Sequence, residues 1–487
     1  MNKPVELASQ LFVELNGTRL APEVTQNLQA ALVDQHVHAP SMFWLRFADR
    51  DFANFDRETF RLADSIEISA KDRQGTLHNL FKGEVVFFEV NCGEGMVVET
   101  TVGGYDFSHR LLRNTKTRSF LNVKDSDLAH KIAAEAGYLQ VGEIETTSIV
   151  HEHLIQNNQS DLEFLQSRAQ RIGFECFLQG TDLYFRPPLQ RASDLRLVYG
   201  QDLIRFNVRI SLADQIGEVC VKGWDSDRQA PIIGRADQGA LAPVLKNGLD
   251  LPAAGRKIGA ERRVILHQDL TTQSEADRVA QAYLDELSGN LIQATGVVFR
   301  RPDVKAGQII EIGGLGKRLL GEYLVTRVRH RYGPNGLESE LHVTGRRRGF
   351  LLETSRIRGN GNAQRGPATA IVTNVDDPKG QGRVKIRYPW LTEELESNWV
   401  RVVAPGAGPK IGICVLPSVN DEVMVLFEQD DLNRPYIIGG LWNGVHAPPQ
   451  ADAAANQHFI IQSAGDIDIR AKGDLRLNGK RIDLNGD

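Results

Sequence analysis

Two closely spaced histidine pairs have the residue type and spacing that a metal site requires. In an extended backbone, His36 and His38 would lie on one face, and so would His151 and His153. Neither pair has a third ligand nearby in the sequence, and the chain contains no HExxH motif. We therefore interpret them as surface or loop histidines and predict no metal site.

Paired acids and nucleophile motifs give no stronger sign of catalysis. The acids in Glu393–Glu396 and the pair Asp430-Asp431 resemble glycosidase carboxylates in type, but acids in turn-rich segments usually form solvated faces. The sequence has no GxSxG elbow, phosphate-binding loop or dinucleotide fingerprint. Its four cysteines form no CxxC pair, which argues against a disulfide framework or a zinc site. We predict no catalytic residue and no cofactor.

Length and composition favour a multidomain globular chain. The 487 residues exceed what one core usually supports, and the 41% hydrophobic and 24% charged content is ordinary for folded protein. A net charge of -5 gives no general attraction to nucleic acid or anionic membrane. The N-terminus lacks a basic region followed by an apolar run, so we expect synthesis in the cytoplasm without a signal peptide.

Strand signals dominate the first 354 residues, and an α+β segment interrupts them. Residues 12–17 alternate and end in Asn-Gly, a hairpin signal, and residues 85–90 and 97–102 form a second pairing. Strands resume after residue 200, where residues 321–330 alternate cleanly and have their partner at 338–344. The pattern predicts a barrel or sandwich over 1–105, an α+β insert over 106–200 and further strands over 201–354.

Three helices are expected from capping signals. Ser126 would cap a helix that runs to Ala136, with Gly137 just beyond its end. Ser160 and Glu163 form a capping box before a second helix, which Gly173 ends. A third helix should run from about residue 273 to 287 behind Thr272 and Glu275.

A polar, Gly-rich linker over 355–366 precedes five short strand patterns. Their number, spacing and length predict a small closed barrel over 367–447, such as an OB-fold. The patterns cover Ala370–Val375, Arg383–Tyr388, Trp399–Val403, Glu422–Phe427 and Pro435–Leu441.

The tail, within 448–487, repeats apolar pairs at a fixed step. Each pair recurs after eight residues, except the last, which comes one residue early. A short period with glycine at the corners is what a β-helix or β-prism needs. The apolar residues of this repeat are Phe459, Ile461, Ile467, Ile469, Leu475, Leu477, Ile482 and Leu484.

One copy of this repeat cannot close such a structure, because its apolar face would stay in water and its strand edges unpaired. Three copies around a common axis would bury both, with Asp468, Arg470, Lys472 and Arg476 facing solvent. The alternative is one small antiparallel sheet packed on the barrel, but that arrangement needs no strict eight-residue step. We predict a trimer with the eight apolar positions as its core.

Two sets of residues resemble those of a known family. The chain resembles VgrG-type spike proteins and phage tail hubs in the run Ser160–Leu165 followed by Gly173-Phe174. The barrel region adds Gly382–Ile386, Trp399–Val402, Gly412, Pro417, Asp421–Val423, Val425, Phe427, Asp430-Asp431, Pro435, Ile438–Gly440 and Asn443. The resemblance covers nearly the whole chain in the family's order of hub, OB-fold barrel and β-helical needle.

The resemblance implies a mainly β fold with tandem hub barrels at 1–105 and 201–354, and a structural role. It implies a homotrimer whose hub mates with the sixfold inner tube ring and with baseplate proteins of a contractile injection system. The needle would puncture the target membrane and carry a PAAR-type tip protein near Asp487. A cargo or effector would travel with it, and the chain would act in an extracellular or virion-like particle.

Two alternatives remain. Some relatives carry a cell-wall hydrolase between barrel and needle, yet only about ten residues separate Val445 from the tail. OB-folds often bind nucleic acid, but residues 367–447 contain seven Lys and Arg against ten acids, the wrong sign for phosphates. Trp390, Trp399 and Trp442 should pack in the barrel or between protomers. A trimer would also bring three copies of His458 together, but nothing places them on the axis.

Overall fold

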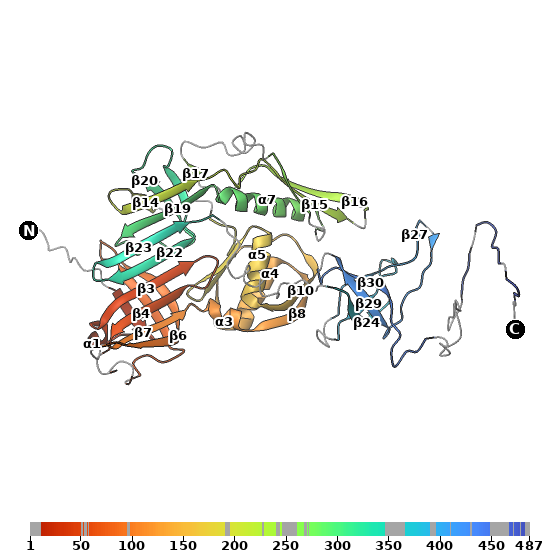
Figure 1. Ribbon diagram of the computed structural model, residues 1–487, viewed down its shortest axis with the longest axis horizontal. Helices are drawn as coiled ribbons and strands as arrows, with labels where there is room; N and C mark the ends of the chain where they lie inside the picture. The colour runs from red at the N-terminus through yellow and green to blue at the C-terminus, as the bar shows by residue number, and fades with distance from the viewer. Residues whose placement is uncertain are drawn as a thin grey trace, which may run out of the picture.

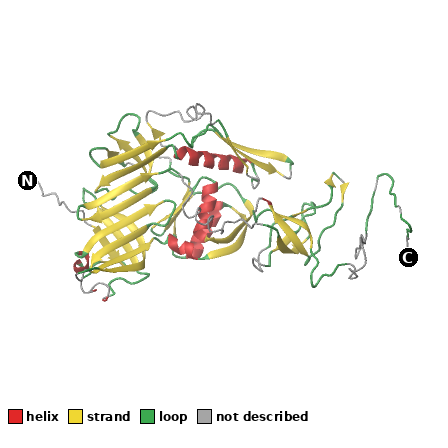
Figure 2. Cartoon of the chain, in the orientation of Figure 1, coloured by secondary structure: helices red, strands yellow, loops and turns green. Residues whose placement is uncertain are grey.

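The computed structural model describes most of the chain. It covers residues 11–49, 52, 56, 58–94, 98–189, 195–225, 228–239, 244–245, 261–266, 270, 272–345, 366–389, 396–409, 411–428, 431–448, 467–470, 472–477 and 479–482. Strands predominate, and the longer helices gather in the middle of an elongated molecule (Figure 2). The mainly β fold class with an α+β insert is confirmed.

An eleven-stranded antiparallel sheet forms one end of the molecule (Figure 1). Its strand order is β14-β19-β23-β22-β3-β4-β7-β6-β5-β1-β2. The N-terminal elements are β1 (Leu11–Leu15), β2 (Thr18–Arg19), α1 (Pro22–Thr25), β3 (Leu28–His36), β4 (Met42–Ala48), β5 (Ser65–Lys71), β6 (Leu77–Cys92) and β7 (Val98–Tyr105). The later strands are β14 (Leu203–Ile210), β19 (Ile292–Phe299), β22 (Arg327–Gly333) and β23 (Gly336–Val343).

The two strand-rich regions of the sequence meet where β3 pairs with β22. This register runs from Arg327 opposite His36 to Tyr332 opposite Ala31. Each region keeps a separate apolar core, one around Phe43, Phe47 and Ile68, and the other around Tyr323. The predicted hairpin is present, because Asn16 and Gly17 both have the positive φ that a tight turn between β1 and β2 needs.

The predicted strand over 321–330 is wrong as a single element. Gly321–Leu324 forms β21 in a four-stranded sheet with β13 (Arg196–Val198), β20 (Ile309–Gly313) and β17 (Val244–Leu245), whereas β22 belongs to the eleven-stranded sheet. The chain changes sheets at Val325 and Thr326, whose N–H groups donate to the carbonyls of Gln308 and His342. Alternation alone carries no sign of such a change of partner.

The insert packs three helices against short strands. Its elements are α3 (Ser108–Arg113), β8 (Thr115–Val123), α4 (Asp125–Ala136), β9 (Gln140–Ile144), β10 (His151–Ser160), α5 (Asp161–Arg171), β11 (Glu175–Gln179) and β12 (Asp182–Arg186). The capping box before α5 is confirmed: Glu163 N–H donates to Ser160 Oγ, and Ser160 N–H donates to Glu163. The predicted Ser126 cap is wrong, because Lys124 occupies the cap position and Ser126 bonds Thr147 inside the insert.

The third predicted helix is α7 (Gln273–Gly289), where Thr272 Oγ1 accepts the N–H of Glu275. It covers a three-stranded sheet of β16 (Ala230–Ala236), β15 (Val219–Asp225) and β18 (Arg263–Leu266). Arg171 of α5 forms an ion pair of 2.9 Å with Glu275, which joins α7 to the insert.

The five predicted barrel strands are all present. They are β24 (Ala368–Asn374), β25 (Lys385–Arg387), β26 (Arg401–Val402), β29 (Glu422–Phe427) and β30 (Pro435–Gly440), and a hairpin of β27 (Ala407–Gly408) and β28 (Ile411–Gly412) projects from them. Their order is β25-β24-β29-β30-β26, and bridges such as Val384 to Val400 connect the two ends. This closure matches the small barrel expected from the sequence. Of the predicted linker over 355–366, only Gly366 lies among the described residues.

Candidate functional site

The described residues of the C-terminal repeat form a set of exposed apolar side chains with a regular spacing. Its described apolar residues are 49–63% exposed: Ile467, Ile469, Leu475, Leu477 and Ile482. Among the described residues of the tail none lies in a strand, and Arg470 and Arg476 each pair with the acid two positions before them. Phe459, Ile461, Leu484 and His458 lie outside the described residues. In a single chain the described apolar residues therefore face solvent, as an unassembled interface would.

A second exposed apolar surface lies on the barrel. Sequence reasoning missed it, although the run Ile411 to Val419 was a usable signal, because six apolar residues and a proline fall outside any predicted strand. Side chains of this run are 42–76% exposed: Ile413, Val415, Leu416 and Val419. We call these four residues the barrel apolar loop. Trp442 is 69% exposed, so it does not pack inside the barrel, and its packing between protomers stays a prediction.

The histidine pairs do not form metal sites among the described residues, where no group of three or more ligand side chains comes together. His36 Nδ1 accepts the N–H of His38, and burial lowers the pKa of His36 to about 4. His151 lies beside Asp125, whose pKa is held far below its usual range by Arg168 and His151 against the effect of burial. Burial likewise lowers the pKa of His153 to about 4.

The described paired acids make structural contacts. Glu396 forms an ion pair of 2.6 Å with Lys385 and accepts the hydroxyl hydrogen of Thr373. Asp431 accepts both the backbone and the side-chain N–H of Asn433 at 2.9 Å. Glu393, Glu394 and Asp430 are outside the described residues. The described carboxylates form hydrogen bonds in turns and ion pairs. This arrangement is not that of a general acid and a general base.

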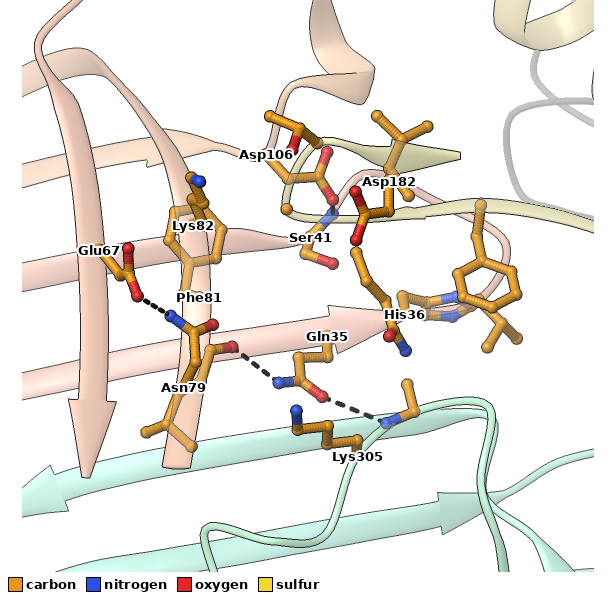
Figure 3. A pocket seen from close by; sticks show the side chains of 18 residues that line it. Gln35, His36, Ser41, Glu67, Asn79, Phe81, Lys82, Asp106, Asp182 and Lys305 are labelled. Atoms are coloured by element: carbon orange, nitrogen blue, oxygen red, sulfur yellow. Dashed lines mark hydrogen bonds between the residues drawn. The ribbon is translucent and has the colours of Figure 1, made fainter. Parts of the chain in front are cut away.

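A polar pocket of about 320 Å³ lies where the insert meets the hub (Figure 3). It collects residues from β3, β5, β6, the β11–β12 turn and the loop at Lys305, so no local motif could have revealed it. Within it, Gln35 Nε2 donates to the Leu80 carbonyl and Gln35 Oε1 accepts the N–H of Ala306. The bond with Ala306 joins the two strand-rich regions.

Asp106 lines this pocket together with Lys82, Glu67 and Asp182. Burial raises its pKa to about 6, against the hydrogen bonds that it accepts from Ser41 and Ser108. Because these bonds hold the β7–α3 turn against β4, we interpret Asp106 as structural.

Trp399 of the barrel is half-buried and contacts two cations. Its ring lies beneath two cations, with Lys385 Nζ 5.5 Å and the Arg383 guanidinium 5.9 Å from the centroid. Arg383 is also bonded to Asp377, whose pKa it lowers, and Lys385 is paired with Glu396. Both cations are thus paired with carboxylates, which reduces their attraction to a phosphate backbone. Trp390 is outside the described residues.

Comparison with known families gives two matches in chain order. Residues 41–333 match the family described as Alg8 N-terminal domain. Residues 368–442 match the family described as type VI secretion system/phage-baseplate injector OB domain. Because the first match covers more than half of the 487 residues, the chain belongs to that family. The second match and the curated relatives named as spike proteins support a protein of the VgrG type.

The sequence relatives and solved structures agree with this. A spike protein of the Pseudomonas aeruginosa type VI secretion system, VgrG4b, is 23% identical over 399 residues, 72% of this chain and 46% of the relative. An Escherichia coli type VI secretion component, described as similar to T4 bacteriophage tail proteins gp27 and gp5, has a TM-score of 0.57 at 14% identity, over 88% of this chain and 99% of that one.

A 43 kDa prophage tail protein from Shewanella oneidensis has a TM-score of 0.53 at 12% identity, over 69% of this chain and 98% of that one. These structures share the fold of the hub, and the first also extends over the barrel. The chain spans less than half the length of the curated relatives that it matches. No helix within the described residues is long and apolar enough to cross a membrane.

Proposed function

We propose that three copies of this chain form the hub and spike at the end of the inner tube of a contractile injection system. The hub barrels cap the tube and nucleate its assembly, and the C-terminal repeat is the core of a needle that punctures the target membrane. One observation carries this proposal: the described apolar residues of the repeat remain exposed, although the repeat keeps an eight-residue step up to its last pair.

Assembly of three tails would bury these side chains and pair their backbone edges at once. Complete burial of one Ile or Leu side chain is worth roughly 1.5–3 kcal/mol, so five described residues from each of three chains make a substantial driving force. Because all backbone N–H and C=O groups need partners away from water, strand pairing between chains would accompany this burial. The barrel apolar loop and Trp442 extend the proposed contact to the OB-type barrel.

The proposed role is mechanical and involves no catalysis. Partners follow from it: the inner tube ring, baseplate proteins, a tip protein of the PAAR type beyond the needle, and a delivered cargo or effector. The chain would be made in the cytoplasm and act in an assembled particle outside the cell. Matching curated relatives are mostly named as spike proteins, and one is named as an actin cross-linking toxin.

The oligomeric state tests the central part of the proposal. Light scattering on the purified full-length chain should give the mass of a trimer. Ile469→Asp would place three carboxylates in the proposed dry core, where unpaired charges are very costly, and should reduce the species to monomer. Lys472→Asp is the matched control: it also introduces an acid into the repeat, but at an exposed, water-facing position, and should stay trimeric.

A monodisperse monomer of the unmodified chain would overturn the trimer. Equal masses for both variants would contradict the register given for Ile469. The non-catalytic part has its own test, because peptidoglycan hydrolysis by the purified trimer would show it to be wrong. Electron microscopy of particles carrying a labelled chain should place the label at one end of the tube.

A further inference from the structure

The outer strand of the insert, β10, lies against the OB-type barrel. Figure 1 shows β10 at the boundary between the insert and the sheet that contains β24, β29 and β30. Among the described strands β10 pairs with β8 alone, in a two-stranded sheet, so one of its edges is open to a neighbour. An open edge presents N–H and C=O groups that need partners.

Neighbouring side chains of β10 enter two different cores. Leu154 packs in the core of the insert, whereas the next residue, Ile155, packs in the core of the barrel and is only 5% exposed. Successive side chains of a strand point to opposite faces, so this single strand connects the two cores. The barrel residues that share the cluster with Ile155 include Ala370, Val384, Val400, Val425, Leu432 and Ile437.

Two polar contacts fix the same strand to the barrel. The N–H of Ile155 donates to Asn433 Oδ1 at 2.9 Å, and this asparagine is held in place by Asp431. Asn398 Nδ2 donates to Glu152 Oε2, also at 2.9 Å. Asn433 therefore gives the outward N–H of β10 the acceptor that a further strand would otherwise supply.

These contacts join segments that are far apart in the sequence. Ile155 and Asn433 are separated by 278 positions, and the peptide connection between hub and barrel runs through residues 346–365, outside the described part of the chain. We propose that β10 is a docking strand that holds the barrel on the hub without the peptide connection. In the spike proposed above, on which this step rests, the push of the tube would pass through the Ile155 contact.

Close packing would let this contact transmit force between the hub and the barrel. Protein cores are close-packed and have low compressibility, so they transmit strain. An apolar side chain buried in a neighbouring core, together with a satisfied edge N–H group, resists both separation and sliding.

Cleavage of the peptide connection in the folded chain tests the proposal. A site for a specific protease is placed within residues 355–366 of the full-length chain, and the purified protein is cut under native conditions. We expect the barrel and tail fragment to co-elute with the hub fragment in size-exclusion chromatography. Ile155→Asp should abolish co-elution after cutting. Asn433→Ala, which removes one acceptor, should weaken retention about fivefold in a dilution series.

Val141→Asp is the matched control, since it introduces the same charge at an exposed position of the insert, in β9, and should leave co-elution unchanged. If the uncut Ile155→Asp variant keeps the circular dichroism spectrum and the melting curve of the unmodified chain, the insert still folds. Separation of the unmodified cut chain would overturn the docking strand, and so would full retention in both the Ile155→Asp and the Asn433→Ala variants. Light scattering on uncut chains tests the trimer separately, so the two failures are distinguishable.

Discussion

At the scale of single residues, the contact between insert and barrel contains the imidazole of His153, whose surroundings disfavour its protonated form. Burial lowers the pKa of His153 to about 4 from an ordinary 6.5, and the positive charge of Lys385 acts in the same direction. Nε2 of this ring is buried and has no hydrogen-bond partner among the described residues. Glu396 already pairs with Lys385, and Glu152 accepts from Asn398, so neither is free to compensate a new charge.

This histidine should make the docking of the barrel sensitive to acid. The separated state binds a proton near pH 6.5 and the docked state only near pH 4, so docking is complete above pH 6.5 and weakens as the pH falls towards 4. Each unit of pKa difference corresponds to about 1.4 kcal/mol, and partial solvent access reduces the total, so we expect a loss of about 1–3 kcal/mol. Retention of the cut barrel, measured between pH 7 and 4.5, gives the value.

His153→Gln should remove most of this loss, because the amide has no proton to gain. His36→Gln serves as the comparison, since burial also lowers the pKa of His36 to about 4, but this residue lies in the hub. An equal effect of both substitutions would mean that the acid response belongs to the hub as a whole and not to the contact around His153.

Residue-scale inferences from the sequence succeeded where the signal was local. The Ser160 and Glu163 capping box needs only residues three positions apart, and it is present as predicted. The predicted helix cap at Ser126 is wrong, although serine often caps helices, because Ser126 forms hydrogen bonds with Thr147 from across the insert. Ile155 was not recognised at all, since alternation predicts two faces of a strand but not which core each face enters.

At the scale of elements, the packing of α7 on its sheet depends on the lack of a side chain at one position. A Cβ at Gly234 of β16 would lie 2.1 Å from the carbonyl oxygen of Ala276 and 2.7 Å from the amide nitrogen of Asp277. Both atoms are helix backbone, so no side chain can move aside. The close approach buries Ala276, Val279 and Ala280 against β15 and β16.

Gly234→Ala should therefore displace α7 and destabilise the fold by about 1–3 kcal/mol, the usual cost of overpacking. Urea unfolding of the full chain, followed by circular dichroism, measures the change. Gly333→Ala adds a methyl group where no atom lies within 4 Å and should alter stability much less. Similar midpoints for the two variants would argue against tight backbone packing of α7.

The prediction of strands from the sequence was limited because the strand with which each one pairs, rather than its local propensity, decides which sheet it joins. The barrel strands were found because five short runs with regular turns are enough to specify a small barrel. The strand predicted over 321–330 splits at Val325 and Thr326, where hydrogen bonds to Gln308 and His342 move the chain from one sheet to another. The pocket of Figure 3 shows the same limit, because its residues come from segments separated by more than 200 positions.

At the scale of the whole molecule, the edges of the large sheet and the tail repeat have no strand partner within the described part of the chain. The eleven-stranded sheet ends at β14 on one side and at β2 on the other, and the tail repeat is exposed at the opposite end of the molecule from that sheet (Figure 1). The eight-residue step predicted an assembly, but its register stays a prediction because it depends on chains outside a single copy. The needle core of eight apolar residues remains our proposal.

A trimer held by the tail should melt at a temperature that depends on protein concentration. Mass action favours the assembled state as the concentration rises, and a hundredfold increase would stabilise each chain of a trimer by about 2 kcal/mol if folding and assembly are coupled. For a chain of this size, we expect the midpoint to rise by about 2 °C. Differential scanning calorimetry over this range measures it, and Ile469→Asp, if monomeric, should melt at one temperature throughout. A concentration-independent midpoint in the unmodified chain, together with a trimeric mass, would mean that the tails associate without stabilising the part that melts, and would restrict the repeat to assembly alone.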